Sequence, residues 1–259
     1  MKRKIAFALM LVFLLGLVGC GGNNDGILRK KWSHTYEGYP IVYISPEVSA
    51  PGLVSAYEAL EVSAGGKAAV KLSDTETDDG FSWTGLIGDL SQALDDPAII
   101  ESYPVQQDLS DYDYTIVLSH FRSHSTVGFN GIIKQTAAIS IPSAQCLADG
   151  QNTLRLLAEK GKQTADELDR KMIYVNVMDR LSIESSGIRL PDTATYNIGI
   201  LASYDPVALD QACIDLLYMI REGLPLAAQI EACSGTKILD YAEAIGLGSR
   251  TYAFFVLDS

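Results

Sequence analysis

The sequence predicts one α/β domain with a mostly parallel central sheet covered by helices on both faces. Short β-branched and aromatic runs alternate with longer segments of helical periodicity from residue 39 to the end of the chain. Two runs, residues 114–118 and 172–177, are almost continuously apolar, which is typical of central strands buried on both faces. About 220 residues follow the N-terminal segment, which is enough for a single domain with a large core.

The first half of this domain begins with a predicted strand–helix–strand unit. Pro51 suits the first turn of the helix, and Gly65–Gly66 ends it. Two strands at this spacing predict a βαβ unit whose strands pair in parallel. Residues 97–107 show no clear periodicity. The predicted elements are a strand over 41–44, a helix over 51–60, a strand over 68–72, a helix over 84–94 and a strand over 114–118.

In the second half, the strongest local signals are capping residues at the start of one predicted helix and at the end of another. Asp205 and Pro206 suit the N-cap and the first position of one helix, and Gly246 suits the C-cap of another. Residues 128–131 are expected to form a loop. The predicted elements are helices over 132–139, 152–168, 207–220 and 238–245, and strands over 172–177, 198–201 and 252–257.

The N-terminus has the pattern of an export signal. Three basic residues precede an apolar run over 5–17, which is too short to span a bilayer. The run ends in Leu17-Val18-Gly19-Cys20, which resembles the lipobox of bacterial lipoproteins. We therefore expect a lipoprotein signal peptide over 1–19, a flexible tether over 20–38 that starts at lipidated Cys20, and a globular domain over 39–259. The alternatives are an ordinary signal peptide or an N-terminal anchor helix.

This pattern predicts export and attachment to the outer face of a bacterial cell membrane, or to an outer membrane, through the lipid on Cys20. The formal net charge of the chain is −12, and loss of the three basic residues of the signal takes it to −15. Nucleic acid is therefore excluded as an expected partner, because a phosphate backbone requires clustered Lys and Arg. A small-molecule or protein partner is left unidentified.

The cysteine count limits the cofactors. Of the four cysteines, Cys20 is expected to carry lipid, and Cys146, Cys213 and Cys233 remain, without a C-x-x-C pair. Three thiols cannot complete a four-cysteine iron–sulfur site, so no iron–sulfur cluster is expected from this chain.

The densest group of chemically active residues directly follows the strand over 114–118. In open α/β sheets ligands bind at the carboxyl ends of strands, and a glycine loop that leads into a helix presents N–H groups to an anion. Solvated loop residues around one packed histidine are the alternative. The candidates are Ser119, Arg122, Gly128 and Gly131 for ligand binding, His120 and His124 for a single metal ion, and His120, His124 and Lys134 for catalysis.

Three other patterns carry weaker signals. The acidic residues 74–79 lack the glycine and distal Glu of a calcium-binding loop, so a solvated turn is the better interpretation. Asp205 is explained by helix capping. His34 falls in the predicted tether and is given no role.

Several blocks of the chain, in order, resemble one protein family. They are VYISPEVSAPGLVSAYEAL, DYDYTIVLSHFRSHSTVGFNGIIKQ, MIYVNVMDRLS, NIGILASYDPVALDQACIDLLY and ILDYAEAIGLGSRTY. The chain resembles domain-of-unknown-function family 362, often labelled uncharacterized iron–sulfur centre proteins, over most of its length from residue 41.

The departures from the family pattern concern its metal-binding residues. Where the family usually has cysteines, this chain has Glu184-Ser185-Ser186, and a family histidine before the last block is absent. Ser119, His120, His124 and Lys134 match the family, whereas Arg122 replaces a lysine. The resemblance therefore implies a shortened member that has lost the cysteine positions.

Three functions follow from these observations. The first is a membrane-anchored ligand-binding or accessory lipoprotein with a pocket at residues 120–134. The alternative is a metal-dependent or redox enzyme that uses His120 and His124 with carboxylates such as Asp74 or Glu184. The third is a structural partner of another membrane protein.

Overall fold

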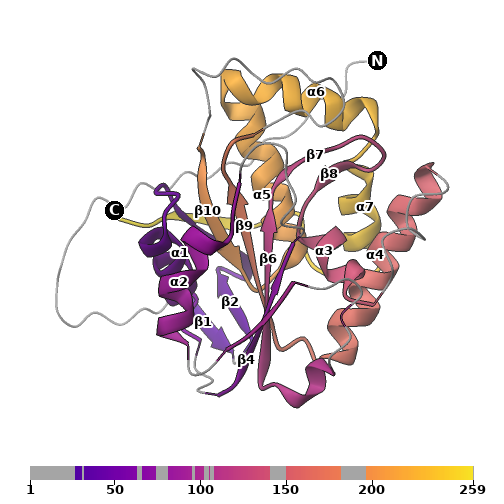
Figure 1. The fold of residues 1–259 in the computed structure, drawn as a ribbon. Coiled ribbons are helices and arrows are strands. Elements are labelled where there is room, and N and C mark those ends of the chain that lie inside the picture. The colour runs from indigo at the N-terminus through magenta and orange to yellow at the C-terminus, as the bar shows by residue number, and fades with distance from the viewer. Residues whose placement is uncertain are drawn as a thin grey trace.

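The fold is built on a mixed sheet whose strand order is β1-β2-β3-β10-β9-β6-β4-β5, with β11 paired to β3 (Figure 1). The computed structural model describes residues 27–30, 32–62, 66–73, 81–94, 97–101, 105, 108–140, 150–181 and 197–258. The strands are β1 (Ile27–Lys30), β2 (Ser33–Tyr36), β3 (Tyr39–Ser45), β4 (Ala68–Leu72), β5 (Ala98–Ile100), β6 (Tyr114–His120), β7 (Arg122–His124), β8 (Gly128–Asn130), β9 (Met172–Met178), β10 (Gly199–Ser203) and β11 (Ala253–Val256).

Most strands of the main sheet run in one direction. The pairs β4–β5, β4–β6, β6–β9 and β3–β11 are parallel, and β10 lies antiparallel to both β3 and β9. Strands β7 and β8 form a separate antiparallel hairpin. Every residue of β6, β9 and β10 is buried, because these strands lie at the centre of the sheet with helices on both sides.

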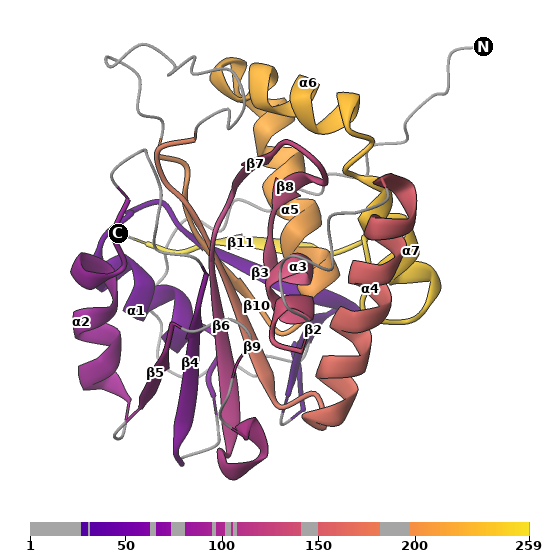
Figure 2. The same cartoon turned by 45° about the vertical axis from the view of Figure 1, so that its right-hand side comes forward.

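Helices cover both faces of the sheet, as the sequence predicts (Figures 1 and 2). One face packs against α1 and α2 through a core that contains Leu53 and Leu90. The other face packs against α3, α4, α5 and α7 through a core that contains Ile133 and Leu209. The helices are α1 (Ala50–Glu58), α2 (Thr84–Ala93), α3 (Ile132–Ala138), α4 (Gly150–Glu167), α5 (Pro206–Met219), α6 (Leu224–Ala232) and α7 (Lys237–Ala244).

The sequence places most elements correctly, and the capping signals explain two of the helix ends. The Asp205 side chain accepts the N–H groups of Val207 and Ala208 at the start of α5, both at 2.9 Å. At the end of α7, Gly246 has a φ of 76°, the left-handed conformation expected of a glycine C-cap.

The predicted parallel pairing of the first two strands is wrong. β3 and β4 point the same way, but β10, β9 and β6 lie between them. These three strands are buried along their whole length and occupy the centre, which leaves β3 and β4 apart. The antiparallel direction of β10 is also a feature that its apolar run does not reveal, since burial on both faces is the same in either direction.

The structure contains elements that the sequence does not predict. β5 lies in the segment without periodicity, β8 forms where a loop is expected, and α6 follows α5 after a short 3-10 turn. Strands β1 and β2 lie within the predicted tether, so folded structure begins before residue 39. The predicted signal peptide and Cys20 lie outside the described residues. In the part of the chain that is described, no helix is both long and apolar enough to cross a membrane.

Candidate functional site

The group of residues that follows β6 lies at a reversal point of the sheet topology. β4 leads to α2 on one face of the sheet, whereas its neighbour β6 leads to α3 on the opposite face. Adjacent parallel strands whose connections leave on opposite faces form a crevice at their carboxyl ends, where open α/β folds bind ligands. We call the carboxyl ends of β4, β6 and β9, together with the β7–β8 hairpin, the carboxyl edge.

His120 is held firmly at this edge. Its backbone N–H donates to Ser73 Oγ at 3.1 Å, and this hydrogen bond joins the ends of β6 and β4. Its ring stacks on Phe81, with 3.9 Å between centroids and 8° between planes. Its Nε2 lies 2.7 Å from the carbonyl oxygen of Asp179, and since a carbonyl only accepts, Nε2 carries the hydrogen. The tautomer and the orientation of this buried ring are therefore both fixed.

The hairpin carries two more of the predicted residues, Arg122 and His124, and both are partly exposed. Among the described residues Arg122 forms no ion pair. His124 Nδ1 accepts the backbone N–H of Thr126 at 3.3 Å and so closes the turn of the hairpin. The hairpin therefore presents a cationic side chain beside the buried His120.

Asn130 connects the strand end to helix α3. Its Nδ2 donates to the carbonyl of His120 at 3.3 Å, and its Oδ1 accepts from Lys134 Nζ at 2.8 Å and from Gln135 Nε2 at 2.7 Å. The ammonium of Lys134, which is partly exposed, is thus fixed beside the carboxyl edge.

The N-terminus of α3, where the sequence predicts an anion site, already holds a carboxylate of the protein itself. Asp210, on α5, accepts the N–H groups of Ile132 at 2.8 Å and Ile133 at 3.0 Å, and a further bond from Asn176 Nδ2 at 2.8 Å. Burial raises the pKa of Asp210 to about 6 despite these bonds. The helix terminus therefore binds an internal anion.

Both glycines of this loop have structural reasons to be glycine. A Cβ on Gly131 would lie 2.5 Å from Asp210 Oδ1. Gly128 has a φ of 90°, and a Cβ there would lie 2.6 Å from the Cα of Gly235. Neither feature requires an external ligand.

Two buried polar atoms beneath the carboxyl edge have no hydrogen-bond partner among the residues that the structure describes. They are Ser119 Oγ and Asn176 Oδ1, and both residues are fully buried. The two residues are register partners on β6 and β9. Orphaned buried polar atoms are rare in folded proteins, so this pair marks a polar spot in an otherwise apolar core.

The structure thus brings together Ser119, His120, Arg122, His124 and Lys134 at one edge of the sheet. It does not group His120 and His124 with a third ligand: in the described ranges no three His, Cys, Asp or Glu side chains are placed to hold a metal ion. The carboxylates proposed to join them, Asp74 and Glu184, lie outside those ranges.

Sequence reasoning missed the buried residues that support the edge, namely Asn130, Asn176 and Asp210. A polar residue inside an apolar strand or helix was the available signal: Asn176 interrupts a continuous apolar strand, and Asp210 lies on the buried side of α5. The hydrogen-bond partners of Asn176 and Asp210, however, lie far away in the chain.

Comparison with known proteins gives one family. Residues 68–215 match the family described as "Domain of unknown function (DUF362)". No curated protein matches the chain, and no solved structure matches it either. The family match spans β4 to α5 and thus includes every element of the carboxyl edge. Because it covers more than half of the chain, this protein belongs to the domain-of-unknown-function family 362.

Proposed function

We propose that this protein is a membrane-anchored bacterial lipoprotein that binds a small anionic molecule at the carboxyl edge. The observation that carries the proposal is the hydrogen bond between His120 and Ser73, which places His120 at the reversal point between β4 and β6. This position is where open α/β sheets bind ligands.

The charges around this position favour an anion. Arg122 has no ion pair among the described residues, and the ammonium of Lys134 is held by the amide oxygen of Asn130. Two cationic side chains at one edge stand out in a chain with a net charge of −12. Arg is well suited to planar, bidentate recognition of carboxylate or phosphate, and Lys adds a point charge.

The lipid on Cys20 is the second part of the proposal. The lipobox-like sequence Leu17-Val18-Gly19-Cys20 supports it, as does the short apolar run before it. Attachment would place the domain on the outer face of a cell membrane or on an outer membrane, where the ligand would come from outside the cytoplasm.

A metal-dependent or redox enzyme is the second candidate, and one observation favours it. A metal-binding histidine usually donates its other ring N–H to a carbonyl or carboxylate, and His120 donates Nε2–H to the Asp179 carbonyl. A single metal ion is the cofactor this candidate would use, with His124 as a further ligand.

An iron–sulfur cluster does not fit the described cysteines. Cys213 is fully buried in α5, contacts Asn176, and burial raises the pKa of its thiol, which disfavours the thiolate that a cluster needs. Cys233 donates to the carbonyl of Ser125 and lies elsewhere, directly after α6. Neither proposal therefore includes a cluster.

The anion-binding proposal is tested by thermal unfolding of the isolated protein in the presence of inorganic phosphate, citrate or adenosine monophosphate. A bound probe raises the unfolding midpoint by mass action. We expect at least one probe to stabilise the wild type and the Arg155→Ala control, and to lose its effect in Arg122→Ala. Arg155 is an exposed arginine of α4 that pairs with Glu159. Absence of stabilisation by all three probes, or equal stabilisation of Arg122→Ala, contradicts the proposal.

Metal analysis distinguishes the metal-dependent or redox enzyme from the anion-binding protein. Stoichiometric metal in protein purified without oxygen, lost in His120→Ala, would support the enzyme. Metal-free protein that still responds to an anion would support the binding protein.

A further inference from the structure

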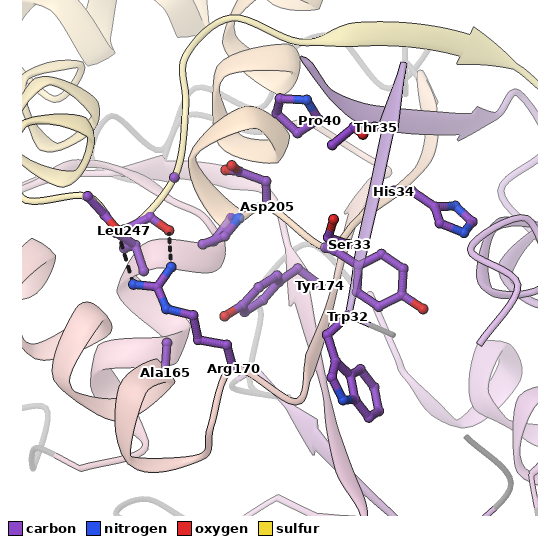
Figure 3. Close-up of a pocket in the computed structure, with 14 residues that line it drawn as sticks. Trp32, Ser33, His34, Thr35, Pro40, Ala165, Arg170, Tyr174, Asp205 and Leu247 are labelled. Carbon is purple, nitrogen blue, oxygen red and sulfur yellow. Dashed lines mark hydrogen bonds between the residues drawn. The ribbon is translucent and has the colours of Figure 1, made fainter. Parts of the chain in front are cut away.

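A cavity of about 330 Å³ lies at the opposite end of the sheet from the carboxyl edge (Figure 3). Arg170, one of its lining residues, lies two residues before β9, and Tyr204 directly follows β10, which runs antiparallel to β9. Both positions mark the amino-terminal end of β9, whereas His120 lies at the carboxyl end of the parallel strand β6. The cavity is therefore independent of the carboxyl edge.

One wall of the cavity is aromatic and held in place by ring contacts. Trp32, His34 and Tyr204 line it. The Tyr204 ring meets His34 edge-on at 5.5 Å between centroids, and meets Trp32 edge-on at 6.3 Å. Such edge-to-face pairs are favourable beyond their buried area, so the wall exists before a ligand arrives. This wall suits a flat apolar ring.

The other side of the cavity presents hydrogen-bond donors. Tyr174 is only 3% exposed, and its hydroxyl donates to the Met172 thioether at 3.3 Å, which is a weak acceptor. Burial raises the pKa of this hydroxyl, so it stays a neutral donor. In Figure 3 the hydroxyl end of the ring points toward Arg170.

Arg170, which forms an ion pair with Asp166, supplies further donors. Its guanidinium donates to the carbonyls of Gly246 at 3.0 Å and Leu247 at 3.3 Å, and to Asp166 at 2.8 Å. A guanidinium has five N–H groups, so two stay without a partner among the described residues. Tyr174 and Arg170 together therefore favour an acceptor that carries a negative charge.

Asp205 also lines the cavity but is already satisfied as an acceptor. Its carboxylate takes the N–H groups of Val207 and Ala208, both at 2.9 Å, and of Ser249 at 3.0 Å. It lies against Gly248, where a Cβ would collide with it. Its role is to cap α5 and to hold the chain after α7, and it is turned away from the Tyr174 hydroxyl.

We propose that this cavity binds a small carboxylic acid with one ring, the ring against Trp32 and Tyr204 and the carboxylate on Tyr174 and Arg170. The size agrees, because ligand cavities begin at about 300 Å³, which suits a single-ring molecule.

The test uses phenylacetate as the probe, titrated by calorimetry into the protein as isolated from the expressing cell. We expect phenylacetate to bind more tightly than phenylacetamide, which lacks the charge, and phenethylamine not to bind. Tyr174→Phe keeps the ring and removes only the hydroxyl, and should weaken phenylacetate binding about tenfold. Arg170→Gln should weaken it at least as much.

Tyr252→Phe is the matched control, because its hydroxyl bonds to Asp215 and Tyr252 does not line the cavity. It should leave the affinity unchanged. If Arg170→Gln fails to fold, Tyr174→Phe decides alone. Failure of phenylacetate to bind at millimolar concentration, equal binding of phenethylamine, or unchanged affinity in Tyr174→Phe overturns the proposal.

Discussion

The carboxylate of Asp210 on α5 packs directly against Gly131 at the start of α3, so that a Cβ on Gly131 would lie 2.5 Å from Oδ1. The same carboxylate accepts the first two N–H groups of α3. The buried carboxylate of Asp210 fits at the start of α3 because Gly131 has no side chain. This contact fixes α3 beneath the carboxyl edge.

Gly131→Ala should therefore destabilise the protein by about 1–3 kcal/mol, since the methyl group must displace a buried carboxylate. The matched control is Gly85→Ala in α2, where a Cβ would meet nothing within 4 Å. That change should stabilise by about 0.5–1 kcal/mol, because alanine favours a helix. Urea unfolding of both variants gives the comparison. Equal free energies of unfolding for the two variants would contradict the packing described here.

Asp210→Asn should also destabilise the protein, by about 1–3 kcal/mol, at pH 7. An amide has only one acceptor oxygen, so its NH₂ group would face the N–H of Ile132 or Ile133. The measurement is the free energy of unfolding in urea. Asp215→Asn, a partly buried residue of the same helix, is the comparison that shows whether the loss is specific to the cap.

The pH dependence of this difference has a defined sign. Burial raises the pKa of Asp210 to about 6, above the value of about 3.9 in an unfolded chain. The folded state therefore binds the proton more tightly, and the stability this gives is complete below pH 4 and is lost as the pH rises through 6. The advantage of wild type over Asp210→Asn should be larger at pH 4 than at pH 7. A larger advantage at pH 7 would mean that the pKa of Asp210 is lowered on folding.

Ser119→Ala should change the stability by less than about 0.5 kcal/mol, because the hydroxyl makes no hydrogen bond to any described part of the chain. Ser203→Ala is the matched control: this serine is equally buried, but its Oγ donates to the carbonyl of Ile41 at 2.7 Å and accepts the N–H of Asp205 at 3.1 Å. The control should cost about 1–2 kcal/mol. Similar losses in both variants would show that Ser119 has a partner in solution, such as an ordered water.

Cys20→Ser should abolish lipid attachment. We expect the wild type, but not this variant, to incorporate radioactive palmitate in growing bacteria and to sediment with membranes. Cys233→Ser, which alters a partly exposed cysteine of the folded domain, serves as the control and should behave as the wild type. Palmitate incorporation that persists in Cys20→Ser would contradict the lipoprotein proposal.

The positions of the elements could be predicted because burial and capping leave local marks in the sequence. β6 and β9 are apolar runs because helices cover both faces of the sheet. Asp205 and Pro206 mark the start of α5 as its N-cap and first residue. The order of strands could not be predicted, since β3 and β4 carry no information about the three strands between them.

The same limit applies to the candidate site. His120 and Arg122 could be found because they lie at and just after the end of the central strand β6. Asp210 could not, because its partner Ile132 lies 78 residues earlier and nothing in the helix sequence marks that contact. For the same reason the sequence does not reveal that the chain itself supplies a carboxylate to the start of α3.

The most direct test of the central claim is native mass spectrometry of the isolated protein after incubation with the anion that most raises its unfolding midpoint. We predict a one-to-one adduct on the wild type and on Arg155→Ala, and its loss from Arg122→Ala. An adduct of equal abundance on all three proteins, or none on the wild type, would contradict anion binding at the carboxyl edge.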